Sequence, residues 1–179
     1  MLSYAISDPS TLDFKTLEKD IARFAKSADI LVYRDKQNPN YAMDAKRFLD
    51  EAKKYSFQKV LLHNSIDHAS DLKADGVHLS SDRLEEIRNA KNKELFVVVS
   101  THSIEEAQKA QMLGADMVTF SPVFDTPGKG EAVGLEKLAE VTLAISIPVI
   151  ALGGILTPAQ IDACEQAGAK GFASIRYFK

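Results

Sequence analysis

Short apolar runs alternate with amphipathic segments along the 179 residues of the chain. The apolar runs predict strands at residues 2–6, 29–33, 59–62, 76–79, 95–99, 116–120, 147–155 and 171–175. Apolar residues three or four positions apart predict helices between them, at residues 13–26, 41–55, 67–72, 81–90, 103–113, 135–144 and 158–167. The pattern therefore consists of strands and helices in strict alternation.

This alternation predicts a parallel sheet, because parallel strands need long crossover connections. Eight strand–helix units favour a closed (β/α)8 TIM barrel that forms a single α/β domain over residues 1–179. An open doubly wound sheet is the alternative, but it usually has fewer strands and a glycine-rich turn after the first strand. Here the first strand is followed by Ser7-Asp8-Pro9-Ser10, which contains no glycine.

The end of the chain limits how the barrel is covered. Only four residues follow the last predicted strand, so we expect a trimmed barrel that lacks the eighth helix. The wall between the eighth and first strands should then be apolar and exposed, and a second subunit could cover it. The sequence therefore predicts a homodimer.

Composition and charge exclude several functions. Hydrophobic residues make up 45% of the chain and charged residues 26%, as is usual for a globular protein. The net charge is −3, with no long basic run, so we expect no nucleic-acid partner. No apolar stretch reaches the length of a membrane span and no secretion signal is evident, so we expect no membrane partner. Cys164 is the only cysteine, which excludes an intrachain disulfide or cysteine–zinc cluster and favours the cytoplasm.

The seventh apolar run ends in two glycines, Gly153 and Gly154, just before a new helix. Glycine lets the backbone approach a ligand, and amides beside a helix N-terminus suit a phosphate. A tight turn without any ligand is the alternative. The eighth run leads to Ile175 and Arg176, and in barrels the loops after strands seven and eight commonly bind phosphate together. We therefore predict a phosphate site at these four residues.

Polar side chains follow most of the other predicted strands. A single one could be a solvated strand end, but barrel ligands bind where the carboxyl ends of all strands meet. The strand ends therefore predict a substrate site that contains Arg34, Lys36, His63, Asn64, His78, Ser100, Thr126 and Lys129.

Six segments in order carry a family resemblance. They are Tyr4-Ala5-Ile6-Ser7-Asp8, Tyr33-Arg34-Asp35-Lys36, Asp75-Gly76-Val77-His78-Leu79, Ser100-Thr101-His102-Ser103, the loop 122–129 and the stretch 147–155. Together they resemble the thiamine phosphate synthase/thiazole tautomerase (TenI-like) family across nearly the whole chain. The resemblance implies an enzyme that binds hydroxyethylthiazole phosphate in thiamine biosynthesis. The synthase joins this thiazole to hydroxymethylpyrimidine pyrophosphate with Mg²⁺, whereas the tautomerase moves protons to make a carboxythiazole phosphate aromatic.

The departures from the family pattern lie on the metal and pyrophosphate side. The Asn-Asp pair of the synthase aligns with His63 and Asn64, so a charged Mg²⁺ ligand is missing, and a neutral amide replaces it poorly. Asp82 is a weak candidate for a second acidic ligand, with a one-residue slip. A serine of the synthase near the chain end aligns with Arg176. We therefore expect no metal, except Mg²⁺ if the protein is a synthase.

His102 aligns with the acid–base histidine of the tautomerase. An imidazole can accept and return a proton near neutral pH, as a tautomerisation requires. A histidine is also frequent here in the synthase, so it separates the two enzymes little. A structural role is the favoured interpretation of His63 and His78. The sequence thus favours a thiazole tautomerase; the alternatives are a thiamine phosphate synthase and a non-catalytic binder of a phosphorylated ligand.

Overall fold

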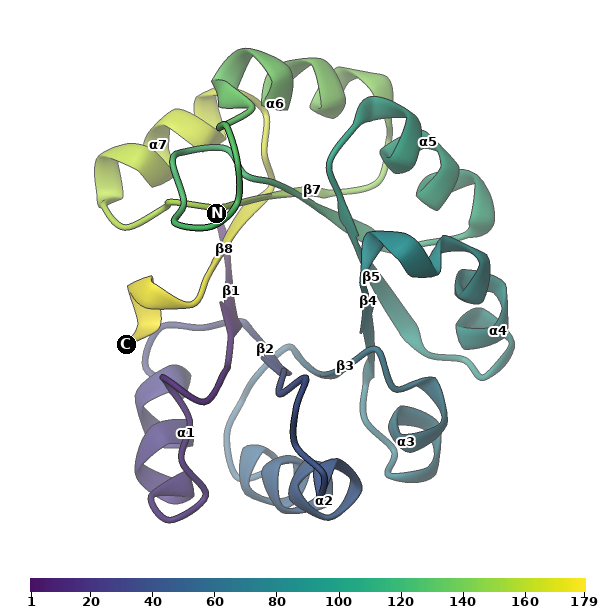
Figure 1. Ribbon diagram of the computed structural model, residues 1–179, viewed down its shortest axis with the longest axis vertical. Helices are drawn as coiled ribbons and strands as arrows, with labels where there is room; N and C mark the ends of the chain where they lie inside the picture. The colour runs from purple at the N-terminus through teal and green to yellow at the C-terminus, as the bar shows by residue number, and fades with distance from the viewer.

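Eight parallel strands pair in chain order and close into a barrel, because β8 pairs back onto β1 (Figure 1). The computed structural model describes all residues from 1 to 179. The strands are β1 (Leu2–Ile6), β2 (Ile30–Tyr33), β3 (Lys59–His63), β4 (Gly76–Leu79), β5 (Phe96–Thr101), β6 (Met117–Phe120), β7 (Val149–Leu152) and β8 (Gly171–Ser174). The predicted TIM barrel is therefore confirmed.

Seven helices surround the barrel, as the sequence predicts (Figure 1). They are α1 (Leu17–Ala25), α2 (Tyr41–Ala52), α3 (Ile66–Asp71), α4 (Ile87–Asn92), α5 (Ile104–Leu113), α6 (Gly134–Ala144) and α7 (Pro158–Gln166). No helix is both long and apolar enough to cross a membrane.

Several helix boundaries differ from the prediction, and two of the differences have clear local causes. The first helix begins at Leu17 rather than at Asp13, because Asp13 accepts a hydrogen bond from the Lys15 amide and forms a turn. The segment predicted as one helix at 81–90 divides into a 3-10 turn, η1 (Ser81–Glu86), and α4. The backbone of Arg83 is non-helical at this division.

Apolar side chains pack in two layers, one inside the barrel and one between strands and helices. The inner layer consists of Tyr4, Ile6, Ile30, Val32, Leu61, Val98, Met117, Ile150 and Ala173. The outer layer contains 39 buried residues, so most of the core lies under the helices. Because successive side chains of a strand point to opposite faces, a strand buried on both faces is a continuous apolar run. This explains why the apolar runs of the sequence predict the strands.

The barrel wall at β8 is covered by the chain itself, so the expectation of an exposed wall was wrong. The last residues form a 3-10 turn, η2 (Arg176–Phe178), in the space between α7 and α1 (Figure 1). The Phe178 ring stacks on Phe172 with centroids 5.9 Å apart, and the two residues are only 4% and 5% exposed. Arg23 on α1 donates a hydrogen bond of 3.0 Å to the Phe178 carbonyl. One aromatic side chain thus covers the β8 position that an eighth helix would have covered.

Candidate active site

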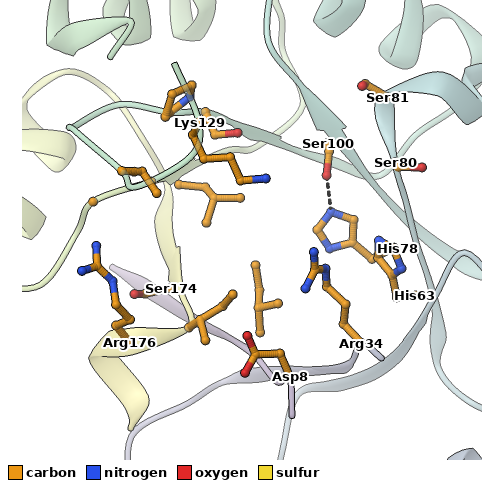
Figure 2. Close-up of a pocket in the computed structure, with 18 of the residues that line it drawn as sticks. Asp8, Arg34, His63, His78, Ser80, Ser81, Ser100, Lys129, Ser174 and Arg176 are labelled. Carbon is orange, nitrogen blue, oxygen red and sulfur yellow. Dashed lines mark hydrogen bonds between the residues drawn. The ribbon is translucent and has the colours of Figure 1, made fainter. Parts of the chain in front are cut away.

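A cavity of about 690 Å³ opens at the carboxyl ends of the strands (Figure 2). All predicted site residues line it except Asn64: Arg34, Lys36, His63, His78, Asp82, Ser100, His102, Thr126, Lys129, Gly153, Gly154, Ile175 and Arg176. The rim of a parallel barrel brings these distant segments together because every strand ends there. Sequence reasoning missed Asp8 after β1 and Ser174 at the end of β8, although the same strand-end rule applies to both.

The Gly153-Gly154 turn presents free backbone donors to the cavity. The amides of both glycines donate to no acceptor within the protein. Both residues have positive φ, 101° and 69°. A Cβ on Gly153 would lie 2.7 Å from Pro122 Cα, and a Cβ on Gly154 would lie 2.6 Å from the Asp125 oxygen. Packing therefore requires glycine here even without a ligand, while the free amides suit an anion.

Positive side chains outnumber negative ones in the cavity wall. Arg34, Lys36, Lys129 and Arg176 line it, against two carboxylates, those of Asp8 and Asp82. None of the four cations lies within ion-pair distance of an acidic group. Figure 2 shows Arg34 and Lys129 directed into the cavity from opposite sides. Their charge remains available for an anionic ligand.

The residues at the position where the resemblance implied a metal site fit Mg²⁺ poorly. The Asn64 side chain is held by Ser80, whose amide donates to Oδ1 at 2.8 Å and whose hydroxyl accepts from Nδ2 at 3.0 Å. Asp82 accepts a hydrogen bond from the Ser80 hydroxyl, and this bond lowers the pKa of the Asp82 carboxyl, helped by Arg83 and Lys36. No three acidic, histidine or cysteine side chains converge on a possible metal position. Mg²⁺ prefers several carboxylate and water oxygens, which this corner does not supply.

His102 is held in one orientation at the end of β5. Its Nδ1 lies 2.9 Å from the Ser121 carbonyl oxygen, and its backbone amide donates to Glu106 Oε2 at 2.7 Å. A carbonyl can only accept, so Nδ1 carries the hydrogen. In the neutral ring Nε2 is then an acceptor, free to take a proton from a ligand in the cavity.

The other two cavity histidines are neutral. Burial lowers the pKa of His63 to about 3, with smaller contributions from the charges of Arg34 and Lys36. Burial likewise lowers the pKa of His78 to about 3. Their ring centroids are 6.0 Å apart. Neither ring therefore carries a positive charge near neutral pH.

The fold and the cavity define a barrel protein whose site suits a small anionic ligand such as a phosphate ester. A family model described as thiamine monophosphate synthase matches residues 3–178. The chain is 35% identical over 181 residues to a putative thiamine-phosphate synthase 2 of Aquifex aeolicus, covering 98% of this chain and 96% of that protein. It is 36% identical over 157 residues to a thiamine-phosphate synthase of Methanocella arvoryzae, covering 84% and 74% of the two chains.

A solved structure agrees with these relatives. Thiamine phosphate pyrophosphorylase from Pyrococcus furiosus superposes with a TM-score of 0.81 at 26% identity, covering 97% of this chain and 85% of that one. The chain therefore belongs to the thiamine phosphate synthase/TenI family, as the sequence motifs indicated.

We expect Arg176→Gln to weaken the binding of hydroxyethylthiazole phosphate. A charge-assisted hydrogen bond contributes about 1.5–3 kcal/mol, so its loss should raise Kd by about tenfold or more. Isothermal titration calorimetry can measure this, with Arg88→Gln on the exposed side of α4 as the matched control. Equal affinity of the two variants would contradict a phosphate contact at Arg176. Gly153 variants are poor probes because a Cβ there would collide with Pro122.

The neutral histidines predict a loss of stability in mild acid. Because the folded pKa of His63 and of His78 is about 3, below the ordinary value of about 6.5, the unfolded chain binds more protons between these values. Their contribution is therefore complete above about pH 6.5 and falls as the pH falls toward 3. At pH 5 a fully neutral histidine costs roughly 2 kcal/mol, and His63, which is only partly buried, costs less. Urea unfolding at pH 7.5 and 5 should show this loss, and His63→Asn should reduce it.

Proposed function

We propose that this member of the thiamine phosphate synthase/TenI family is a thiazole tautomerase. The observation that carries the proposal is His102, whose Nδ1–H is committed to the Ser121 carbonyl and whose Nε2 is therefore a base beside the cavity. A tautomerisation needs one group that takes a proton from one ring atom and returns it to another. It needs no group transfer and no metal.

The proposed reaction uses few residues of the chain. The amides of Gly153 and Gly154, with Arg176, would hold the phosphate of the carboxythiazole phosphate. His102 Nε2 removes a proton from one ring atom, which leaves an imidazolium and an electron-rich ring. The Ser121 carbonyl stabilises that imidazolium through the Nδ1–H bond. The same Nε2 then returns the proton to a second atom, and the product is the aromatic ring with unchanged composition.

Thiamine phosphate synthase is the second candidate function, and the names of the relatives favour it. Both curated relatives and the Pyrococcus furiosus structure are named for that activity. This reaction would join hydroxyethylthiazole phosphate to hydroxymethylpyrimidine pyrophosphate and would require Mg²⁺. The engaged side chain of Asn64 and the single nearby carboxylate of Asp82 argue against a magnesium–pyrophosphate complex at this corner.

Two parallel assays separate the candidates. One contains both synthase substrates with Mg²⁺, and the other contains the carboxythiazole phosphate tautomer with EDTA. We expect the aromatic thiazole phosphate in the second assay and little thiamine phosphate in the first. Thiamine phosphate in the first assay and no aromatic product in the second would establish the synthase instead. No product in either would favour a non-catalytic binder.

His102→Asn tests the role of the base in the same tautomerase assay. The asparagine amide can still donate to the Ser121 carbonyl but cannot take up a proton. We expect the rate to fall by ~10²–10⁴, the usual contribution of general acid–base catalysis. His68→Asn is the matched control, because His68 lies on α3, contacts Ser65 just before that helix and does not line the cavity. A His102→Asn rate close to that of this control would exclude His102 as the base.

We also propose that the chain forms a homodimer, although η2 covers the wall on which that expectation first rested. Several large apolar side chains remain exposed, and Leu143 on α6 and Met112 on α5 are 89% and 75% accessible. α5 and α6 are packed against each other, so both residues lie on neighbouring helices. Light scattering at micromolar concentration should give twice the monomer mass, and Leu143→Asp should lower it if this face forms the contact. A monomeric wild-type protein would exclude the dimer.

A further inference from the structure

A short chain of hydrogen bonds leads from the barrel interior to the cavity. The Tyr4 hydroxyl lies 2.6 Å from His78 Nδ1, and His78 Nε2 lies 2.9 Å from Ser100 Oγ. The three residues come from β1, β4 and β5, and the His78–Ser100 bond is drawn in Figure 2. Only Ser100 and His78 line the cavity, whereas Tyr4 lies in the inner apolar layer.

Tyr4 has one possible hydrogen-bond partner. Its side chain is fully buried among the residues of the inner layer, and His78 Nδ1 is the only atom with which its hydroxyl makes a hydrogen bond. Burial raises the pKa of the Tyr4 phenol well above its ordinary value, so the hydroxyl keeps its proton. A buried hydroxyl hydrogen without an acceptor is costly. Tyr4 must therefore donate to His78 Nδ1.

This donation fixes the tautomer of His78. It also decides that the Ser100 hydroxyl accepts, rather than donates, the hydrogen bond to His78. If Nδ1 accepts, the single hydrogen of the neutral imidazole lies on Nε2. Nε2–H then donates to Ser100 Oγ, which makes no other hydrogen bond within the protein. The hydroxyl hydrogen of Ser100 cannot be used toward His78. It is free to point into the cavity.

We propose that Tyr4 and His78 are positioning residues that commit the Ser100 hydroxyl to donate a hydrogen bond to an acceptor atom of the ligand. A carboxylate oxygen, a phosphate oxygen or the lone pair of a ring nitrogen would be accepted at this position, and a donor such as an N–H would be rejected. The inference rests on the proposed function in one respect, because the ligand used to test it is a phosphorylated thiazole.

The His78 tautomer can be measured directly in the ligand-free protein. Long-range proton–nitrogen NMR correlations distinguish Nδ1–H from Nε2–H imidazoles, and the spectrum of His78→Gln identifies the His78 signals among those of the four histidines. We expect Nε2–H in the wild type and a mixture of tautomers in Tyr4→Phe, which preserves the ring but not the hydroxyl. A wild-type Nδ1–H tautomer would overturn the inference without reference to any ligand.

A double-mutant cycle tests whether the three residues act as one unit toward the ligand. Ser100→Ala and Tyr4→Phe should each raise the Kd for hydroxyethylthiazole phosphate or carboxythiazole phosphate by about two- to tenfold, the range of one neutral hydrogen bond. The double variant should bind about as weakly as Ser100→Ala alone, because Tyr4 acts only through Ser100. Tyr55→Phe, which removes a phenol hydroxyl that makes no hydrogen bond within the protein, is the matched control and should bind as the wild type does.

The outcomes separate the inference from the proposed function. Additive effects of Tyr4→Phe and Ser100→Ala, or no effect of either in a wild type that binds the thiazole phosphates, would refute only the role of this hydrogen-bond chain. If the wild type binds neither thiazole phosphate, the proposed function is wrong and the ligand contact of Ser100 falls with it. The NMR tautomer would still decide whether Tyr4 controls His78.

Discussion

Closure of the parallel sheet between β8 and β1 is the constraint on which the site depends. In a closed parallel barrel every strand ends on the same rim, so residues far apart in the chain become neighbours. His102 follows β5, Gly153 follows β7 and Arg34 follows β2, yet all three line one cavity. Phe178 covers the wall at β8, and Arg23 anchors its carbonyl to α1.

The electrostatics of the cavity follow from which side chains are already paired. Around the barrel exterior, most ion pairs join residues three or four apart in the chain, whereas the cations of the cavity have no acidic partner. Unpaired cations gathered on one cavity attract an anion because no acidic neighbour neutralises their charge. The corner of the cavity near Asn64 and Asp82 suits a cation poorly. Asp82 is the single carboxylate at this corner, and the neutral amide of Asn64 is already hydrogen-bonded to Ser80, so a divalent cation would find only one charged ligand.

Most of the fold could be predicted from the sequence because the continuous apolar runs of the strands and the three- to four-residue apolar spacing of the helices are both clear. Strands buried on both faces are continuous apolar runs, and the predicted boundaries of β1 and β4 agree with the structure. The helix ends were less predictable, since the Asp13 turn before α1 depends on a side-chain hydrogen bond rather than on periodicity. The exposed wall was wrongly predicted because the stacking of Phe178 on Phe172 is a contact between elements that no local pattern reveals.

The sequence could predict which positions line the site. It could not predict the protonation states, tautomers and hydrogen-bond partners of their side chains. The strand-end rule places the predicted residues in the cavity, and it fails for Asn64 because the left-handed backbone there, with φ of 53°, accompanies a side chain turned toward Ser80. The rule also says nothing about the protonation state or tautomer of the three cavity histidines. Burial makes His63 and His78 neutral, Tyr4 decides which nitrogen of His78 carries the hydrogen, and the Ser121 carbonyl leaves His102 Nε2 as the free base. Proton chemistry in this cavity is therefore set by the partners of each ring, which only the folded barrel brings within reach.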